Sequence, residues 1–315
     1  MKILVVDDEP IFCDLISVEL AACGFKEVCA VNSGAAAISL VRENSSPFDC
    51  ILLDIDMPGM DGIELCRLLR AEPSTTGLPI VMVTARSEVE SVDKAFAAGA
   101  TDYLTKPVDR RELQGRMTMA SGMARERAAR KAVLMQNTTT NALSFEEPFR
   151  LQIDHSCMDY LALQNYVLKL GTMRLFSHIA IAFQVVNAWQ LYQTLDNSEF
   201  QGTMSDVAEV IAEVLVINDA IVSYVGSGFF VALAKRIPEV SVEEISSQIE
   251  MKLQTMNDWY SNLDQMPVLM KIGTPNARGI VNFLSATEIL DTALQNTRES
   301  TAVLGGYSAE NSIVH

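Results

Sequence analysis

The chain has 315 residues, enough for two domains with separate cores. Its formal net charge of −16 argues against nucleic acid as a partner, because acidic surfaces repel phosphates. No apolar stretch of about 18 residues predicts a membrane span, and the first strand starts too close to Met1 to leave room for a signal peptide. The six cysteines lack metal-ligand spacing, so we expect a cytoplasmic protein with reduced thiols and no membrane partner.

Short apolar runs alternate with helical patterns through the first 107 residues. The first helix, 10–22, carries Ile11, Leu15, Val18 and Leu20 at helical spacing. Further helices are predicted at 35–42, 63–70 and 89–98. Five such strand–helix units predict an α/β fold, a doubly wound five-stranded parallel sheet of the flavodoxin-like kind.

Polar side chains follow four of the predicted strands, namely Asp7 with Asp8, Asp54, Thr84 and Lys106. The carboxyl ends of parallel strands lie at one edge of a sheet, which is where ligands bind in such folds. Each residue alone has an ordinary explanation, such as a loop aspartate, a helix cap or a surface lysine. Their combination predicts one shared site.

Carboxylates at this edge predict a site for Mg²⁺, because hard cations take oxygen ligands. We expect Asp8 and Asp54 to bind the metal directly, Asp7 to act through water and Asp56 to offer its backbone carbonyl. Clustered carboxylates repel one another until a cation arrives.

The same residues predict phosphoryl chemistry. The carboxylate of Asp54 can attack a phosphoryl donor and form an acyl phosphate. Lys106 and the metal would neutralise charge on the phosphoryl oxygens, and Thr84 could donate a hydrogen bond to one of them.

Residues 1–120 resemble the receiver domain of two-component response regulators. The resemblance rests on Asp7-Asp8, the segment 54–62, Thr84-Ala85 and Lys106-Pro107. It implies that Asp54 is phosphorylated by a histidine kinase or a phosphotransfer protein, with Mg²⁺ bound. It also implies a switch in which Thr84 moves toward the phosphoryl group and Tyr103 rotates inward.

Residues 108–141 form a predicted connector that overlaps the last helix of this domain. The segment 108–136 predicts one long helix, and its part 108–135 carries 7 basic and 3 acidic side chains. It is either a solvated stalk or a dimerisation helix, so a homodimer through the connector or the receiver is expected. The basic stretch 125–131 is predicted to be a solvated helix face, and the polar segment 136–141 to be a hinge.

Residues 150–315 predict a second domain of α+β class, with the element order β-α-α-β-β-α-β-α. Two apolar runs around Gly226-Ser227-Gly228 predict a β-hairpin whose turn needs positive φ angles. The order and the hairpin resemble the GGDEF domain of diguanylate cyclases. Helices are expected at 154–170, 204–216 and 285–298, and a strand at 268–273.

This second domain departs from the GGDEF pattern where the resemblance implies metal ligands. Ser227 and Val185 stand where the family has carboxylates, and neither can replace them. The nucleotide-recognition and product-inhibition positions also differ, at Gln193, Gly202 and Val216, although Asp219 remains. Among the remaining residues, Trp189 and Trp259 are expected in the core or an interface, and His155 and His178 as structural histidines.

We therefore expect a response regulator that is phosphorylated on Asp54 and controls a catalytically inactive GGDEF-like output domain, not an enzyme. Output would pass to a downstream protein partner or through dimerisation. The alternatives are a non-catalytic sensor of GTP or cyclic di-GMP and, after it, an active diguanylate cyclase. A DNA-binding output is disfavoured by the acidic charge of the second domain.

Overall fold

The structure is a computed structural model that describes most of the chain. The described residues are 1–43, 48–72, 75, 77–85, 89–136, 143–151, 153, 157–236, 242–263, 265–277, 288–300 and 303–304. The chain divides into two compact units, residues Met1–Asn141 and Ala142–His315.

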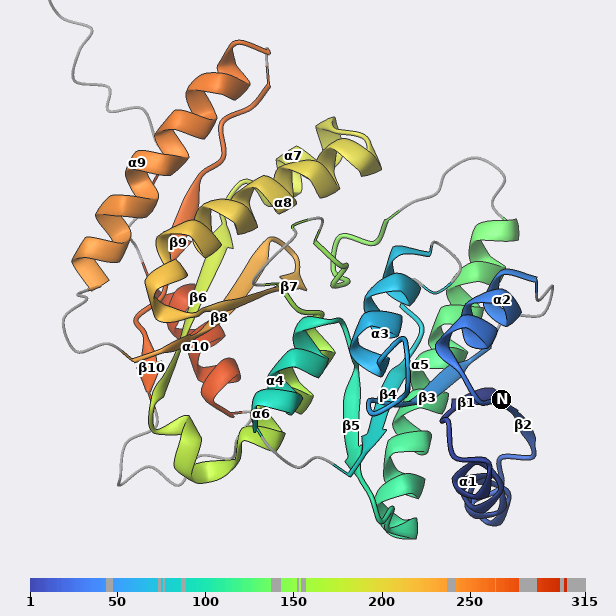
Figure 1. Ribbon diagram of the computed structural model, residues 1–315. Helices are drawn as coiled ribbons and strands as arrows, with labels where there is room; N and C mark the ends of the chain where they lie inside the picture. The colour runs from blue at the N-terminus through green and yellow to red at the C-terminus, as the bar shows by residue number, and fades with distance from the viewer. Residues whose placement is uncertain are drawn as a thin grey trace, which may run out of the picture. The chain divides into compact units, whose positions relative to one another are not determined.

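The first unit alternates strands and helices (Figure 1). In chain order it contains β1 (Lys2–Val6), α1 (Pro10–Ala22), β2 (Glu27–Val31), α2 (Gly34–Glu43), β3 (Cys50–Asp54), α3 (Gly62–Ala71), β4 (Ile80–Thr84), α4 (Val89–Ala97), β5 (Asp102–Thr105) and α5 (Arg110–Gln136). All pairs in the sheet are parallel, in the order β2-β1-β3-β4-β5. This confirms the predicted doubly wound parallel sheet.

Helices cover both faces of this sheet, so its central strands are buried from end to end. Helices α1 and α5 pack on one face, where Ile16, Leu20, Leu113 and Met117 meet strand residues in one apolar core. Helices α2, α3 and α4 lie along the other face (Figure 1).

Helix α1 has the predicted bounds, but three of the four apolar residues that predicted it face outward. Ile11, Leu15 and Val18 are 84%, 56% and 64% exposed. The buried residues are Cys13, Ile16 and Leu20. Both sides of this helix are apolar, so periodicity alone predicts a helix without choosing the face that packs on the sheet.

Helix α5 is the predicted long helix, and its first three turns pack on the sheet through Leu113, Met117 and Ala120. Its side chains beyond residue 125 lie outside the described residues, as do positions 137–141 of the hinge predicted at 136–141, whose first residue, Gln136, ends α5. Within the described residues, no helix is both long and apolar enough to cross a membrane. Dimerisation through α5 stays a prediction.

The second unit has an α+β fold, as predicted (Figure 1). Its elements are α6 (Tyr160–Leu175), β6 (His178–Val185), α7 (Ala188–Thr194), α8 (Asn197–Val214), η2 (Val216–Asn218), β7 (Ile221–Gly226), β8 (Phe229–Lys235), α9 (Val242–Ser261), β9 (Met270–Ile272), β10 (Asn276–Ala277) and α10 (Glu288–Glu299). The antiparallel sheet runs β10-β6-β8-β7, with β9 also paired to β6. Placing β8 between β6 and β7 gives a split β-α-β arrangement.

Helices α8 and α9 build the main core on one face of this sheet, and α6 and α10 pack against the other. The segment before α6 pairs alongside the edge strand β7. Met158 N donates to Val222 O at 3.0 Å, and Ser223 Oγ donates to Met158 O at 2.6 Å. This pairing explains why α6 begins at Tyr160, not at 154 as predicted.

Two other predicted bounds were wrong for local reasons. Helix α8 begins before 204, because Asp196 and Glu199 form a capping box at its start. Strand β9 is shorter than 268–273, because the Asn257 amide bonds both the N–H and the carbonyl of Val268. Helix α10 begins at Glu288 in the described residues, which leave out positions 285–287 of its predicted range.

Candidate functional site

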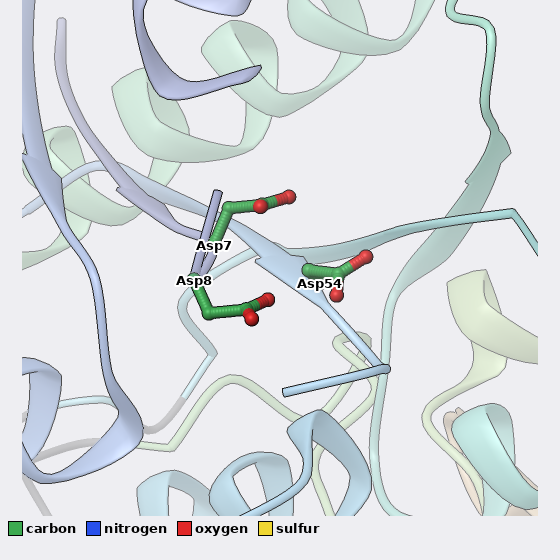
Figure 2. Close-up of side chains that lie close together, drawn as sticks. All are labelled: Asp7, Asp8 and Asp54. Carbon is green, nitrogen blue, oxygen red and sulfur yellow. The ribbon is translucent and has the colours of Figure 1, made fainter. Parts of the chain in front are cut away.

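Strands β1 and β3 bring three carboxylates together at the carboxyl edge of the first sheet. The register pairs Val6 with Leu53, so Asp7 and Asp54 come next on neighbouring strands. One carboxylate oxygen each from Asp7, Asp8 and Asp54 lie within 4.8 Å of one another. Figure 2 shows the three side chains projecting into the same space.

Lys106, just past β5, reaches across β4 to this cluster. Its Nζ lies 2.6 Å from Asp7 Oδ2 and 3.0 Å from Asp54 Oδ1. The ammonium also lies 3.9 Å from the centroid of the Phe12 ring, a cation–π contact from α1. Sequence reasoning missed Phe12, because aromatic contacts between distant segments leave no local pattern.

Burial and charge act on these groups in opposite directions. Burial is the main cause that raises the pKa of Asp54, and repulsion from Asp7 adds to it, while Lys106 opposes both. Burial disfavours the charged form of Lys106, but Asp7 and Asp54 outweigh it and raise the pKa of the ammonium. Three carboxylates and one ammonium leave a formal charge of −2 when all four are ionised.

The donor set fits a divalent, oxygen-seeking cation such as Mg²⁺. Asp8 forms no hydrogen bond or ion pair with any residue that the structure describes, so its oxygens can accept a metal. Asp7 is already engaged, since its Oδ1 accepts from Glu9 N at 2.9 Å and its Oδ2 from Lys106. Direct binding by Asp8 and binding through water by Asp7 stay predictions.

Thr84, Asp56 and Tyr103 complete the predicted set. Thr84 is buried at the end of β4, and its Oγ1 donates to Asp56 Oδ2 at 3.2 Å. The backbone N–H of Asp56 donates to the carboxylate of Asp54. Tyr103 lies inside the first unit and is fully buried. The fold therefore gathers Asp7, Asp8, Asp54, Asp56, Thr84 and Lys106 at one edge and places Tyr103 on β5 nearby.

The turn after β3 is fixed by Asp61 and Gly62. Asp61 caps α3 by accepting from Glu64 N at 2.7 Å. A Cβ on Gly62 would collide with the carbonyl of Asp54, so only glycine lets α3 begin this close to the strand end. In the sequence, the pair Asp61-Gly62 is the signal for this close contact between the start of α3 and the end of β3.

The family described as response regulator receiver domain matches residues 3–118, which contain the whole carboxylate cluster and Lys106. Residues 3–118 are a response regulator receiver domain. The match ends at residue 118, so the GGDEF resemblance of the second unit stays a prediction.

Curated relatives resemble the chain over the receiver domain. The DNA-binding response regulator MtrA of Mycolicibacterium smegmatis is 40% identical over 116 residues, which are 37% of this chain and 48% of MtrA. Two-component response regulator ORR23 of rice is 37% identical over 114 residues, 36% of this chain and 16% of ORR23. The chain thus spans about half the length of the mycobacterial relatives it matches and 16% of the length of ORR23.

Solved receiver structures show the same likeness. Chemotaxis protein CheY4 of Vibrio cholerae is 29% identical with a TM-score of 0.35, covering 38% of this chain and 97% of CheY4. The receiver domain of sensor histidine kinase PA1611 from Pseudomonas aeruginosa is 30% identical with a TM-score of 0.35, covering 39% of this chain and 96% of its own. That structure holds a magnesium ion in its active-site cleft.

Outside the receiver domain, the β7–β8 hairpin has the predicted turn. Gly226, Ser227 and Gly228 have φ angles of 104°, 53° and 78°, so all three lie in the left-handed region. Gly228 lies against the end of β6, where Val185 N donates to its carbonyl at 2.8 Å. The structure therefore brings Ser227 and Val185 close together, and neither offers a carboxylate.

The segment 143–149, here called the strap, covers this hairpin turn. Ser227 N donates to Phe145 O at 2.7 Å, and a Cβ on Gly226 would collide with the carbonyl of Glu146. Phe145 packs edge-on against Trp189, with ring centroids 5.0 Å apart, and Phe149 packs on Tyr224 at 4.4 Å. The sequence prediction began the domain at residue 150 and missed this segment.

Other predicted residues of the second unit have structural roles or lie at its surface. Asp219 forms an exposed ion pair with Lys235 at 2.7 Å, and His178 Nδ1 lies 2.9 Å from Arg174 O. Trp189 and Trp259 are both more than half exposed, so neither is a core residue, and the predicted alternative of an interface position stays a prediction. His155 lies outside the described residues.

Proposed function

We propose that the chain is a phosphorylation-controlled regulator in which Asp54 accepts a phosphoryl group from a histidine kinase or a phosphotransfer protein. The observation that carries this proposal is the position of Asp54. Its carboxylate ends a buried strand, opens onto the cluster with Asp7 and Asp8, and lies 3.0 Å from Lys106. A carboxylate held beside a cation is a competent nucleophile for phosphorus.

The surrounding residues support each requirement of the transfer. Lys106 can neutralise a phosphoryl oxygen, because its ammonium already lies at the carboxylate that would carry the group. Asp8 and Asp54, with the carbonyl of Asp56, would hold Mg²⁺, which supplies charge neutralisation when bound. The new acyl phosphate would place oxygens that the Thr84 hydroxyl can reach after leaving Asp56.

The switch follows from this change of partner. In this structure Thr84 donates to Asp56, and Tyr103 is buried one strand away. Moving Thr84 toward a phosphoryl group alters the space beside β5, so Tyr103 can report the state of Asp54 to the helices around it. The second unit would receive that signal through the connector or through a change of dimer state.

We infer that the second unit acts as a binding module and not as a nucleotide cyclase. Metal-dependent cyclisation of GTP needs carboxylates at the hairpin turn and at the end of β6, where this chain has Ser227 and Val185. The turn is also covered by the strap. Among the described residues, the one cluster of three potential metal ligands is in the receiver domain.

The residues of the second unit disfavour two other outputs, nucleotide sensing and DNA binding. A sensor of GTP or cyclic di-GMP would need cations for the phosphates, whereas Val216 replaces the expected arginine and Asp219 is paired with Lys235. MtrA is named as DNA-binding, but the match spans 48% of it. The 20 acidic and 9 basic side chains of residues 136–315 oppose that output here.

The direct test measures cyclic di-GMP formation from GTP and Mg²⁺, with and without phosphorylation by acetyl phosphate. We expect no turnover in either state, while wild type takes up label and Asp54→Ala does not. Sustained cyclic di-GMP production would contradict the binding-module role. Calorimetric titration with GTP and cyclic di-GMP distinguishes a sensor, which would bind without turnover.

A further inference from the structure

Helices α8 and α9 of the second unit border an open groove of about 750 Å³. It is lined by Asp206, Glu209, Val210, Glu213, Met251, Lys252, Thr255, Met256 and Trp259. This α8–α9 groove lies on the outer side of the two helices, away from the sheet that their other faces cover. Its size falls within the range of protein sites that bind a ligand or an anchoring side chain.

The floor of the groove is apolar and exposed. Met251 and Trp259 are 66% and 58% exposed, and they lie two helical turns apart on α9. Val210 and Met256 lie between the two helices and continue this surface. Exposed tryptophan and methionine side chains are common anchors of protein interfaces, because they offer large and adaptable contact area.

One rim of the groove is acidic. Asp206, Glu209 and Glu213 are three and four residues apart on α8, so they share one helix face. Tyr260 donates to Asp206 at 2.6 Å, and Lys252 pairs with Glu213. Glu209 has no ion-pair partner within the described part of the chain. The lining therefore carries three negative charges and one positive charge.

We propose that the α8–α9 groove binds a basic amphipathic helix of a partner protein. Apolar side chains of that helix, spaced three and four residues apart, would cover Trp259, Met251 and Met256. Lysine or arginine side chains beside them would meet Glu209 and Asp206 along the rim. This proposal rests on the proposed function, in which the second unit acts by binding, and it names the chemistry of the partner.

The charge of the molecule favours this occupant over two others. A nucleic acid or a phosphate-rich ligand would be repelled by the acidic rim. The same surface of a second copy would bring the same acidic rim face to face with itself, which disfavours a symmetric pairing of grooves. A helix that carries basic side chains beside an apolar stripe satisfies both the floor and the rim.

The test uses the full chain with Trp189→Phe, which leaves Trp259 as the one tryptophan. The probe is a synthetic peptide of about 18 residues, long enough to form a helix when bound, with leucines on one face and lysines beside them. The control peptide has glutamate in place of every lysine. We expect the basic peptide to shift Trp259 emission to shorter wavelength and to saturate, with affinity falling as salt rises.

Calorimetry on variants locates the site. We expect Trp259→Ala to weaken binding at least about tenfold, as for interface anchors, and Glu209→Lys to weaken it by a similar factor. Glu250→Lys makes the same charge change on exposed α9 outside the groove lining and should leave binding unchanged. All titrations use unphosphorylated protein, so a failure of Asp54 phosphorylation leaves this result untouched.

Three outcomes would overturn the assignment. The first is no saturable binding of the basic peptide, and the second is equal binding of the glutamate peptide. The third is equal binding of a peptide with the chain's own residues 119–136, which would make the groove a self-docking site. If binding fails while Asp54 still takes up label, the inference is wrong and the receiver function stands.

Discussion

Lys106 is shared between two carboxylates, with 3.0 Å from its Nζ to Asp54 and 2.6 Å to Asp7. The ammonium group of Lys106 is thus a positive charge within a buried acidic cluster. It compensates charge that burial would otherwise make costly. The same ammonium is positioned to meet a phosphoryl group on Asp54, so one contact serves both stability and the proposed chemistry.

Replacing Lys106 with methionine should destabilise the receiver domain. The change leaves Asp7 and Asp54 without their cation, and we expect a loss of about 2 kcal/mol in the free energy of unfolding, reduced from the fully buried case because Lys106 is partly exposed. Urea unfolding at pH 7 without metal measures it. Lys94→Met removes an exposed ion pair with Glu90 and should change stability by less than about 0.5 kcal/mol. Equal effects of the two variants would contradict this account.

Asp54→Asn should alter the pH dependence of stability in metal-free solution. The pKa of Asp54 is raised above its ordinary value of 3.8, mainly by burial, so the folded state binds the proton more tightly than the unfolded state. Its contribution to stability is present below pH 3.8 and is lost as pH rises through the raised pKa. As pH rises across that range, the free energy of unfolding should therefore decrease less for Asp54→Asn than for wild type. The same pH dependence of stability in both proteins would show that the pKa of Asp54 is not raised by folding.

Mg²⁺ should stabilise the receiver domain through Asp8. A ligand that binds only the folded state adds about 2.7 kcal/mol at 100 times its dissociation constant. We expect the melting temperature to rise with Mg²⁺ in wild type and to stay nearly constant in Asp8→Asn. Asp14→Asn removes an exposed carboxylate from α1 outside the cluster and should respond like wild type. A full response in Asp8→Asn would place the metal elsewhere.

The glycine that meets the strap should be intolerant of substitution. Gly226 has a φ of 104°, and a Cβ there would collide with Glu146 O, so we expect Gly226→Ala to cost at least about 1–3 kcal/mol. Gly202 lies inside α8 with open space around its Cα. Gly202→Ala should therefore stabilise the second unit by roughly 0.5–1 kcal/mol. Thermal unfolding of both variants measures these changes, and a Gly226→Ala protein as stable as wild type would contradict the geometry of this turn.

The carboxylate site could be predicted because each of its residues follows a strand. Apolar runs fix where strands end, and a parallel sheet places those ends at one edge, so Asp54 and Lys106 meet despite their separation in sequence. Tertiary packing decides the rest. The choice between Ile11 and Ile16 as the buried side of α1 depends on a sheet that the helix pattern does not describe.

The second unit was predicted in outline but not in its key contact. Two apolar runs predicted β7 and β8, and the glycines around Ser227 predicted the turn. The strap has no periodic pattern. Its position depends on the packing of Phe145 against Trp189 and on the hydrogen bond from Ser227 N to Phe145 O. Such contacts join segments far apart in sequence, so no local rule reveals them.

The central claim is that Asp54 accepts the phosphoryl group, and intact-mass spectrometry after incubation with acetyl phosphate and Mg²⁺ tests it most directly. Wild type and Asp14→Ala should each gain the mass of one phosphoryl group, and both should lose it on alkaline hydrolysis of the acyl phosphate. Asp54→Ala should gain nothing. A phosphoryl adduct on Asp54→Ala under these conditions would contradict the claim and place the acceptor on another residue.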